Sequence, residues 1–268
     1  MLNVYFAAVW LMFAACNTSS QATEAAPTRT AEPHPPLVRK PQVPTQPLER
    51  PPTPPGQPPY PVQLVGDFGV SAARLSEGLT AEHPDGLGRV AKDGESVEPL
   101  TCQRWLNLRQ AGFTPPQAIE EQAFVSAQRL CGTLQLLEHA QNATQSLVRT
   151  LALDATFADK LPAAVAPTSN RSEEAQRTSA QRQGKSLTAL YPMLDFKPRA
   201  NTLWAEDTAK QRFVALEVTA YGDTNGDGQD DLILSVTHGA LAGSLLASRL
   251  FVLTGDAHTG RLRLLQAF

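Results

Sequence analysis

Nine residues near the C-terminal end of the chain have the types and the spacing of a cation-binding loop. Oxygen-bearing side chains stand at its first, third, fifth and ninth positions: Asp223, Asn225, Asp227 and Asp231. Gly228 stands at the sixth position, and Gln229 at the seventh would contribute its backbone carbonyl. Calcium takes roughly six to eight oxygens, so its loop needs one at nearly every second residue and a glycine at the sharp turn. The sequence therefore predicts a calcium site with Asp223, Asn225, Asp227, Gln229 and Asp231 as ligands.

A plain hairpin turn is the alternative interpretation of the same residues, since Asn-Gly and Asp-Gly are the commonest turn dipeptides. A bare turn, however, does not need further oxygens in alternate positions. Asp223, Asp227, Asp230 and Asp231 would also repel one another unless a cation offsets their charge. Asp230, at the eighth position, is expected to point away from the ion. Magnesium is disfavoured because it prefers octahedral geometry with several waters.

The stretch from Gly222 to Leu234 resembles the Asp-rich calcium loops of the FG-GAP and VCBS repeats and of dockerins. The resemblance implies ligand roles for the five residues named above. The loop is not an EF-hand, because Leu234 stands at the twelfth position, where a Glu closes that loop. Strand-like residues on both sides favour the FG-GAP-like context, and the single copy does not support a propeller.

The N-terminal segment predicts export. Its apolar run is too short to span a bilayer and suits a secretory signal. It ends in Ala14-Ala15-Cys16, which resembles the lipobox of bacterial lipoproteins. The resemblance implies a signal peptide over residues 1–15 and a lipid such as palmitate on Cys16. The protein would then be held at a membrane of the bacterial cell envelope, with its domain in the periplasm or outside the cell. A plain secretory signal or an uncleaved anchor remains the alternative, because Phe13 replaces the usual Leu and no Lys or Arg precedes the run.

Two cysteines remain, Cys102 and Cys131, and in an exported chain they are expected to pair. Closing a loop of about thirty residues would contribute about 3–4 kcal/mol through loop entropy. Two buried free thiols are the alternative.

A proline-rich stretch follows the predicted lipid-attachment residue, so that residues 16–61 form a lipid-anchored linker. Fourteen of the 35 residues from Pro27 to Pro61 are proline. Each proline fixes φ and removes a backbone donor, which predicts a disordered, extended tether. A ligand for an aromatic groove is the alternative for residues 51–55.

The remaining chain is divided into three regions. Residues 62–166 are predicted to be mainly helical, with helices over 100–110 and from residue 117 to 137, a shorter one over 145–158, and one short strand within 62–70. Residues 167–186 are a polar linker or a solvated helix. Residues 187–268 are β-rich, because strand-like runs at 213–221, 232–236, 250–253 and 262–265 predict an antiparallel meander. The predicted fold class is therefore α+β: a disulfide-stapled helical hairpin plus a small antiparallel β-meander, preceded by the disordered Pro-rich tether.

Composition excludes some function classes and leaves others open. The charge balance of 23 basic and 26 acidic residues argues against nucleic acid as a partner. No catalytic constellation is found, so we expect an envelope lipoprotein with a calcium-stabilised binding or scaffolding domain. Its partners would be the membrane, and envelope proteins or cell-wall polymer. The alternatives are an accessory or inhibitor subunit of an envelope complex, and a calcium-supported hydrolase with Glu206, Asp207 and Glu217 as nominal candidates.

Overall fold

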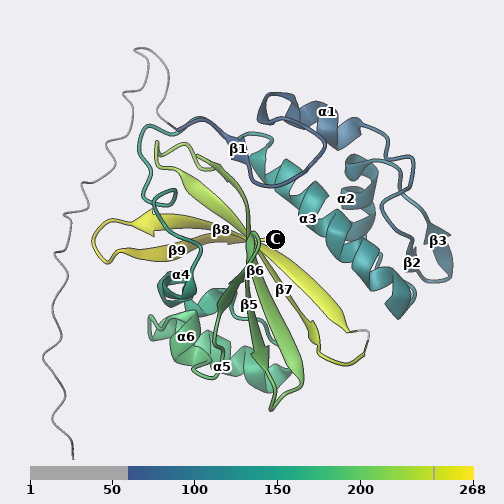
Figure 1. The fold of residues 1–268 in the computed structure, drawn as a ribbon. Helices are drawn as coiled ribbons and strands as arrows, with labels where there is room; N and C mark the ends of the chain where they lie inside the picture. The colour runs from purple at the N-terminus through teal and green to yellow at the C-terminus, as the bar shows by residue number, and fades with distance from the viewer. Residues whose placement is uncertain (1–59, 244) are drawn as a thin grey trace, which may run out of the picture. The chain divides into compact units, whose positions relative to one another are not determined.

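A seven-stranded antiparallel sheet is the centre of the computed structural model, which describes residues 60–243 and 245–268 (Figure 1). Its strand order is β4-β5-β6-β7-β8-β9, and β1 pairs with β6. The sheet consists of β1 (Gln63–Leu64), β4 (Lys197–Arg199), β5 (Thr202–Asp207), β6 (Arg212–Gly222), β7 (Asp231–Ala240), β8 (Leu246–Asp256) and β9 (Arg261–Ala267). A separate two-stranded hairpin contains β2 (Val90–Lys92) and β3 (Glu95–Val97).

Both faces of the sheet are covered, and the central strands show this in their sequence. Successive side chains of a strand point to opposite faces. On β7, Leu232 and Leu234 enter one hydrophobic core, and Ile233 between them enters the other. A strand buried on both faces is a continuous apolar run rather than an alternating one. This explains why Leu232-Ile-Leu is uninterrupted.

One face packs against the helices from the first half of the described chain. These are α1 (Leu75–Thr80), α2 (Cys102–Gln110) and α3 (Glu121–Leu137), with the 3-10 turns η1 (Ala72–Arg74) and η2 (Ala118–Glu120). In Figure 1, α3 lies along the sheet with α1 and α2 on its far side. Gly132 permits the close approach of α3 to β8, because a Cβ there would lie 2.5 Å from a methyl carbon of Leu250.

The predicted disulfide is confirmed. Cys102 on α2 and Cys131 on α3 are bonded, with an S–S distance of 2.08 Å, and both are fully buried. The bond therefore joins the two helices inside the core that α1, α2 and α3 share with the sheet.

The other face packs against short helical elements from the middle of the chain. They are α4 (Ala155–Lys160), η3 (Ala163–Val165), α5 (Arg171–Arg182) and α6 (Leu187–Leu190). Phe157, Leu161 and Leu187 from this layer meet Leu216 and Leu253 of the sheet in the larger core. Within the polar stretch 167–186, α5 begins at Asn170, whose side chain accepts a hydrogen bond from the Glu173 N–H.

The predicted architecture of a helical hairpin plus a small meander is wrong. The four predicted strands correspond to β6 to β9, but β1, β4 and β5 extend them into the seven-stranded central layer. β1 is the short strand predicted within 62–70, whereas β4 and β5 are not among the predicted strands, and all three residues of β4 are exposed. The helix expected over 145–158 is limited to α4, and the helix expected from residue 117 to 137 is divided into η2 and α3.

The predicted signal segment, the lipid-attachment residue Cys16 and nearly all of the proline-rich stretch lie outside the described residues. Among residues 60–243 and 245–268, no helix has the length and apolar character needed to cross a membrane. The lipid anchor and the tether therefore stay predictions.

Candidate metal centre

The Asp-rich loop joins β6 and β7, two neighbouring strands of the sheet. It leaves β6 at Gly222 and enters β7 at Asp231, so its first and last predicted ligands stand where the two strands begin to pair. Asp223 and Asp231 are buried, whereas Asn225 and Asp227 are exposed. The buried pair forms the floor of the loop and the exposed pair its rim.

Asp223 organises the backbone of the loop from the floor. Its Oδ1 atom accepts hydrogen bonds from the N–H groups of Gly226 (2.7 Å), Asp227 (3.2 Å) and Asn225 (3.3 Å). Its Oδ2 atom accepts one from Gly228 (2.8 Å). A carboxylate oxygen has two lone-pair sites. Oδ2, with a single donor, therefore keeps room for one further partner.

The rim repeats the same local turn at every second residue. The Asn225 Oδ1 atom accepts from the Asp227 N–H (2.9 Å), and the Asp227 Oδ1 atom accepts from the Gln229 N–H (2.8 Å). Gly226 and Gly228 both have φ 79°, which glycine adopts without a steric penalty. The side-chain oxygens of Asp223, Asn225 and Asp227 thus accept N–H groups of the loop itself, which holds its backbone in a coil.

Asp231 is the residue whose hydrogen bonding is incomplete. It is fully buried, and its Oδ2 atom accepts from the N–H (3.0 Å) and the hydroxyl (2.7 Å) of Thr224. Within the described chain, its Oδ1 atom has no hydrogen-bond partner. Burial raises the pKa of this carboxyl, and the Thr224 bonds and the Thr254 hydroxyl on β8 only partly oppose that rise. Among the residues that the structure describes, Asp231 therefore has no cationic partner.

The five predicted ligands supply the oxygen atoms that calcium prefers, but their carboxylates do not converge on one point. Across residues 60–243 and 245–268, no three His, Cys, Asp or Glu side chains converge as metal ligands. The Asp223 and Asp227 carboxylates are instead occupied with N–H donors of the loop. Among the described residues, the Gln229 carbonyl accepts no hydrogen bond. The backbone of the site is preformed, and its carboxylates would have to turn inward to hold a cation.

Asp230 does point away from the loop, but it has a role that the sequence pattern missed. It is 1% exposed and forms an ion pair with Arg149, whose Nε lies 2.5 Å from Oδ2. The Ser146 hydroxyl donates to the same oxygen at 2.9 Å. Arg149 comes 81 residues earlier in the chain. Nothing in the local sequence of the loop could therefore have identified it as the partner.

A second buried charged cluster lies between α5 and the β5–β6 turn. The Arg212 Nη1 atom lies 3.1 and 3.0 Å from the two Glu173 oxygens, and the Lys210 Nζ atom is 2.7 Å from one of them. Burial favours a raised pKa for Glu173, but the Lys210 bond, the Ser169 N–H and the Arg212 charge hold it below its usual value. These residues line a cavity of about 520 Å³ together with His238. Burial and the Arg212 and Arg249 charges lower the pKa of His238.

The nominal hydrolase residues are each held by a basic neighbour. Glu217 accepts from Arg129 at 2.7 Å, and Asp207 lies 3.4 Å from the Arg212 Nε atom. Glu206 accepts from the Trp204 ring nitrogen at 2.9 Å and lies 3.5 Å from Arg199. Three carboxylates in separate ion pairs do not form an acid and base facing one substrate.

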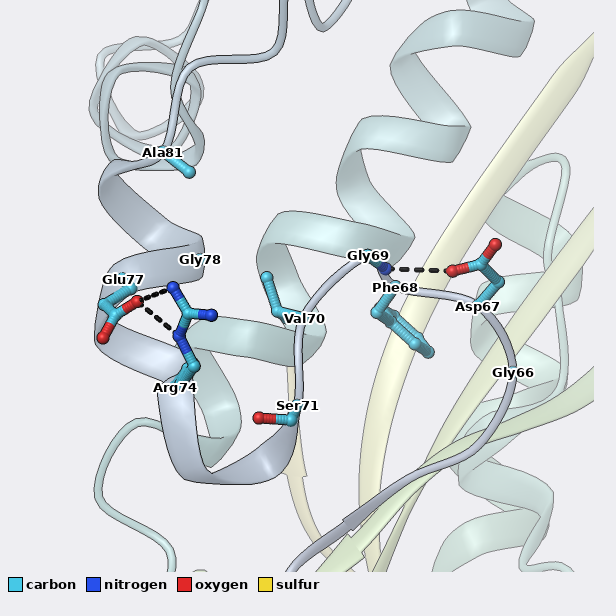
Figure 2. A pocket seen from close by; sticks show the side chains of 10 residues that line it. All are labelled: Gly66, Asp67, Phe68, Gly69, Val70, Ser71, Arg74, Glu77, Gly78 and Ala81. Atoms are coloured by element: carbon cyan, nitrogen blue, oxygen red, sulfur yellow. Dashed lines mark hydrogen bonds and ion pairs between the residues drawn. The ribbon is translucent and has the colours of Figure 1, made fainter.

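Another hollow, of about 500 Å³, lies between α1 and the loop from Gly66 to Ser71 (Figure 2). Figure 2 shows that its charged groups are turned to partners within the same segment. Arg74 pairs with Glu77 one helical turn away, and the Asp67 side chain accepts from the Gly69 N–H at 3.0 Å. Arg74, Glu77 and Asp67, the charged residues that line the hollow, therefore already have partners, and the hollow offers no clear site for a charged ligand.

Known proteins give no further guide to the site. No protein-family model, no curated protein sequence and no solved structure matches the chain. The function is therefore argued from the chain's own residues.

Proposed function

We propose that the chain is a bacterial cell-envelope lipoprotein whose folded domain binds calcium in the loop Asp223–Asp231 and serves in binding or scaffolding. The observation that carries the calcium site is the buried Asp231 Oδ1 atom, which has no hydrogen-bond partner among the residues that the structure describes. A buried carboxylate that lacks a positive partner is unfavourable by several kcal/mol. A cation among the five oxygen donors of the loop would supply the missing charge.

Calcium would have a structural role at this position. The loop fixes the β6–β7 connection and also receives the segment 141–145 through backbone hydrogen bonds. An ion that binds the folded loop and not the unfolded chain stabilises the domain by mass action. The domain would then present its surface to envelope proteins or cell-wall polymer only in its calcium-loaded, rigid form.

Two features of the chain support a location in the cell envelope. Ala14-Ala15-Cys16 resembles a lipobox. The Cys102–Cys131 disulfide is the kind of bond that persists in oxidising compartments such as the periplasm. Metabolic labelling with a palmitate analogue should mark the wild-type chain and not Cys16→Ser. Equal labelling of the two, or no labelling of either, would contradict the lipid anchor.

Thermal unfolding in calcium and in chelator tests the metal site. At a calcium concentration about 100 times Kd, the ion should add about 2.7 kcal/mol, which raises Tm by roughly 5–10 °C for a domain of this size. Asp227→Ala and Asp231→Asn should each remove that rise. Asp195→Asn is the matched control, because Asp195 is exposed and, as far as the structure describes the chain, pairs only with exposed Lys197. Identical curves in calcium and chelator would show that the loop is only a turn.

A further inference from the structure

We propose that calcium in the loop also docks the segment Tyr60–Leu64 onto the domain, and so determines where the proline-rich stretch leaves the fold. This inference rests on the calcium site proposed above. Its basis is a continuous set of contacts that joins three segments far apart in the sequence: the loop, residues 141–149, and residues 60–64.

The first set of contacts joins the loop to residues 141–145. The backbones of Gln141 and Asp223 exchange hydrogen bonds of 2.8 and 2.9 Å. The Gly228 carbonyl accepts from the N–H (2.9 Å) and the hydroxyl (3.0 Å) of Thr144, and from the N–H of Gln145 (3.1 Å). Segment 141–145 has no helix or long strand of its own, so its backbone bonds depend on the loop conformation.

The second set of contacts joins residues 142–149 to the segment Tyr60–Leu64. The Ala143 N–H donates to the Tyr60 carbonyl at 2.8 Å, and the Val62 N–H donates to the Asn142 side chain at 2.9 Å. The Arg149 guanidinium donates to the Pro61 carbonyl at 2.5 Å and to the Gln63 side chain at 3.0 Å. β1 itself contributes only two residue pairs with β6. Residues 142–149 therefore contact Tyr60, Pro61, Val62 and Gln63 through four hydrogen bonds among the described residues.

Two adjacent residues connect the ion site with this docking surface. Asp231, a predicted ligand, belongs to the loop side, and Asp230 belongs to the Arg149 side. Neighbouring side chains of an extended backbone point in opposite directions. Fixing the backbone at Asp230 and Asp231 therefore positions both carboxylates at once. Arg149 is held by Asp230 and by the rings of Tyr60 and Tyr221, at 5.7 and 5.1 Å from the guanidinium carbon.

Loss of the ion would act through the same contacts in reverse. Without a cation, the loop carboxylates repel one another, and the loop opens more often as a local unit. Each opening withdraws the Gly228 carbonyl and the Asp223 backbone from residues 141–145, and these residues then release Tyr60 and Val62. Because linkage is reciprocal, a docked Tyr60–Leu64 segment also strengthens calcium binding.

Hydrogen exchange on the full chain, in calcium and in chelator, tests the docking. Calcium at about 100 times Kd should slow exchange by up to about 100-fold in residues 223–231, 141–145 and 62–65. Slowing in 223–231 without slowing in 62–65 would overturn the docking and leave the calcium site intact. An unchanged rate in all three segments would overturn the calcium site, and the docking with it.

Two variants separate docking from general stability. Asn142→Ala removes the acceptor of the Val62 N–H, so calcium should protect residues 62–65 several-fold less than in the wild type while 223–231 keep their full protection. Gln103→Ala is the matched control, since within the described part of the chain the Gln103 side chain bonds only to Asn107, on the exposed side of α2. Arg149→Gln should reduce the calcium-dependent protection of residues 62–65 further, because it removes the hydrogen bonds to Pro61 and Gln63. Equal calcium protection of 62–65 in wild type and Asn142→Ala would contradict the proposed path.

Discussion

Asp231 and Glu173 are both buried carboxylates, but their surroundings differ in one decisive respect. Both Glu173 oxygens face cations or N–H donors: Arg212, Lys210 and the Ser169 backbone. Asp231 has one oxygen bonded to Thr224 and one with no partner among the described residues. The pKa of Glu173 is accordingly lowered by its partners, whereas burial raises that of Asp231. At the first site both carboxylate oxygens have cationic partners, although the Arg212 Nε and Nη2 atoms have no hydrogen-bond partner among the described residues. At the second site one carboxylate oxygen has no such partner.

Arg212→Met should have the largest effect, because it removes the shared cation of Glu173 and Asp207 and leaves both buried. We expect a loss of about 3–5 kcal/mol in the free energy of unfolding, measured by urea denaturation, in calcium and in chelator alike. Arg199→Met is the control. Its ion pair with Glu206 is exposed, so the loss should stay below about 1 kcal/mol. A loss at Arg212 that calcium restores would contradict the separation of the two sites.

The same carboxylate-to-amide change should have opposite consequences at the two sites. Glu173→Gln should lower the free energy of unfolding by about 1.5–3 kcal/mol with or without calcium, because charged hydrogen bonds are lost. Asp231→Asn should leave the calcium-free protein as stable as the wild type or slightly more so, since a buried unpaired charge disappears. It should also abolish stabilisation by calcium. If Asp231→Asn lowers the free energy of unfolding in chelator as much as Glu173→Gln does, the Asp231 carboxylate is already stabilised without a cation.

Gly226 and Gly228 have the same φ of 79°, so comparing them tests how much the Asp-rich loop depends on its contact with Thr144. A Cβ at Gly226 meets nothing within 4 Å, whereas a Cβ at Gly228 lies 3.1 Å from the Thr144 hydroxyl oxygen. Gly226→Ala should cost about 1–2 kcal/mol from the left-handed backbone alone. Gly228→Ala should cost more and should also reduce the calcium-dependent rise in Tm. Equal losses in the two variants would show that contact with residue 144 is unimportant.

The smallest expected effect is a pH dependence of stability that comes from Glu173. The folded-state pKa of Glu173 is below its ordinary value of 4.5. Its contribution to stability is therefore present above about pH 4.5 and is lost as the pH falls through the lowered value. Urea midpoints measured between about pH 7 and pH 3 should fall less steeply for Glu173→Gln than for wild type. The remaining slope comes in part from Asp154 and Asp256, whose pKa values are lowered by hydrogen bonds from Thr156 and Thr259. Parallel slopes in the two proteins would refute the assignment to Glu173.

The local pattern of residues was sufficient for several features. Two leftover cysteines predicted the bond that the structure contains, and four apolar runs predicted strands that correspond to β6 to β9. The spacing of oxygens from Asp223 to Asp231 predicted a loop between two strands, and Asp223 does coil its backbone. In each of these cases the cause lies in neighbouring residues: turn glycines, alternating oxygens, or strand-forming apolar residues. Calcium itself remains a prediction from the same spacing.

The tertiary structure alone decided how large the sheet is and which charges are buried. β4 and β5 are recruited by pairing with one another and with β6, although Lys197, Pro198 and Arg199 are not a strand-like run. Glu173 meets Arg212, and Asp230 meets Arg149, across separations of 39 and 81 residues. Such partners are chosen by which elements the two hydrophobic cores bring together. Secondary structure and turn chemistry act over a few residues, whereas the packing that neutralises a buried charge acts over the whole chain, so a local pattern cannot contain it.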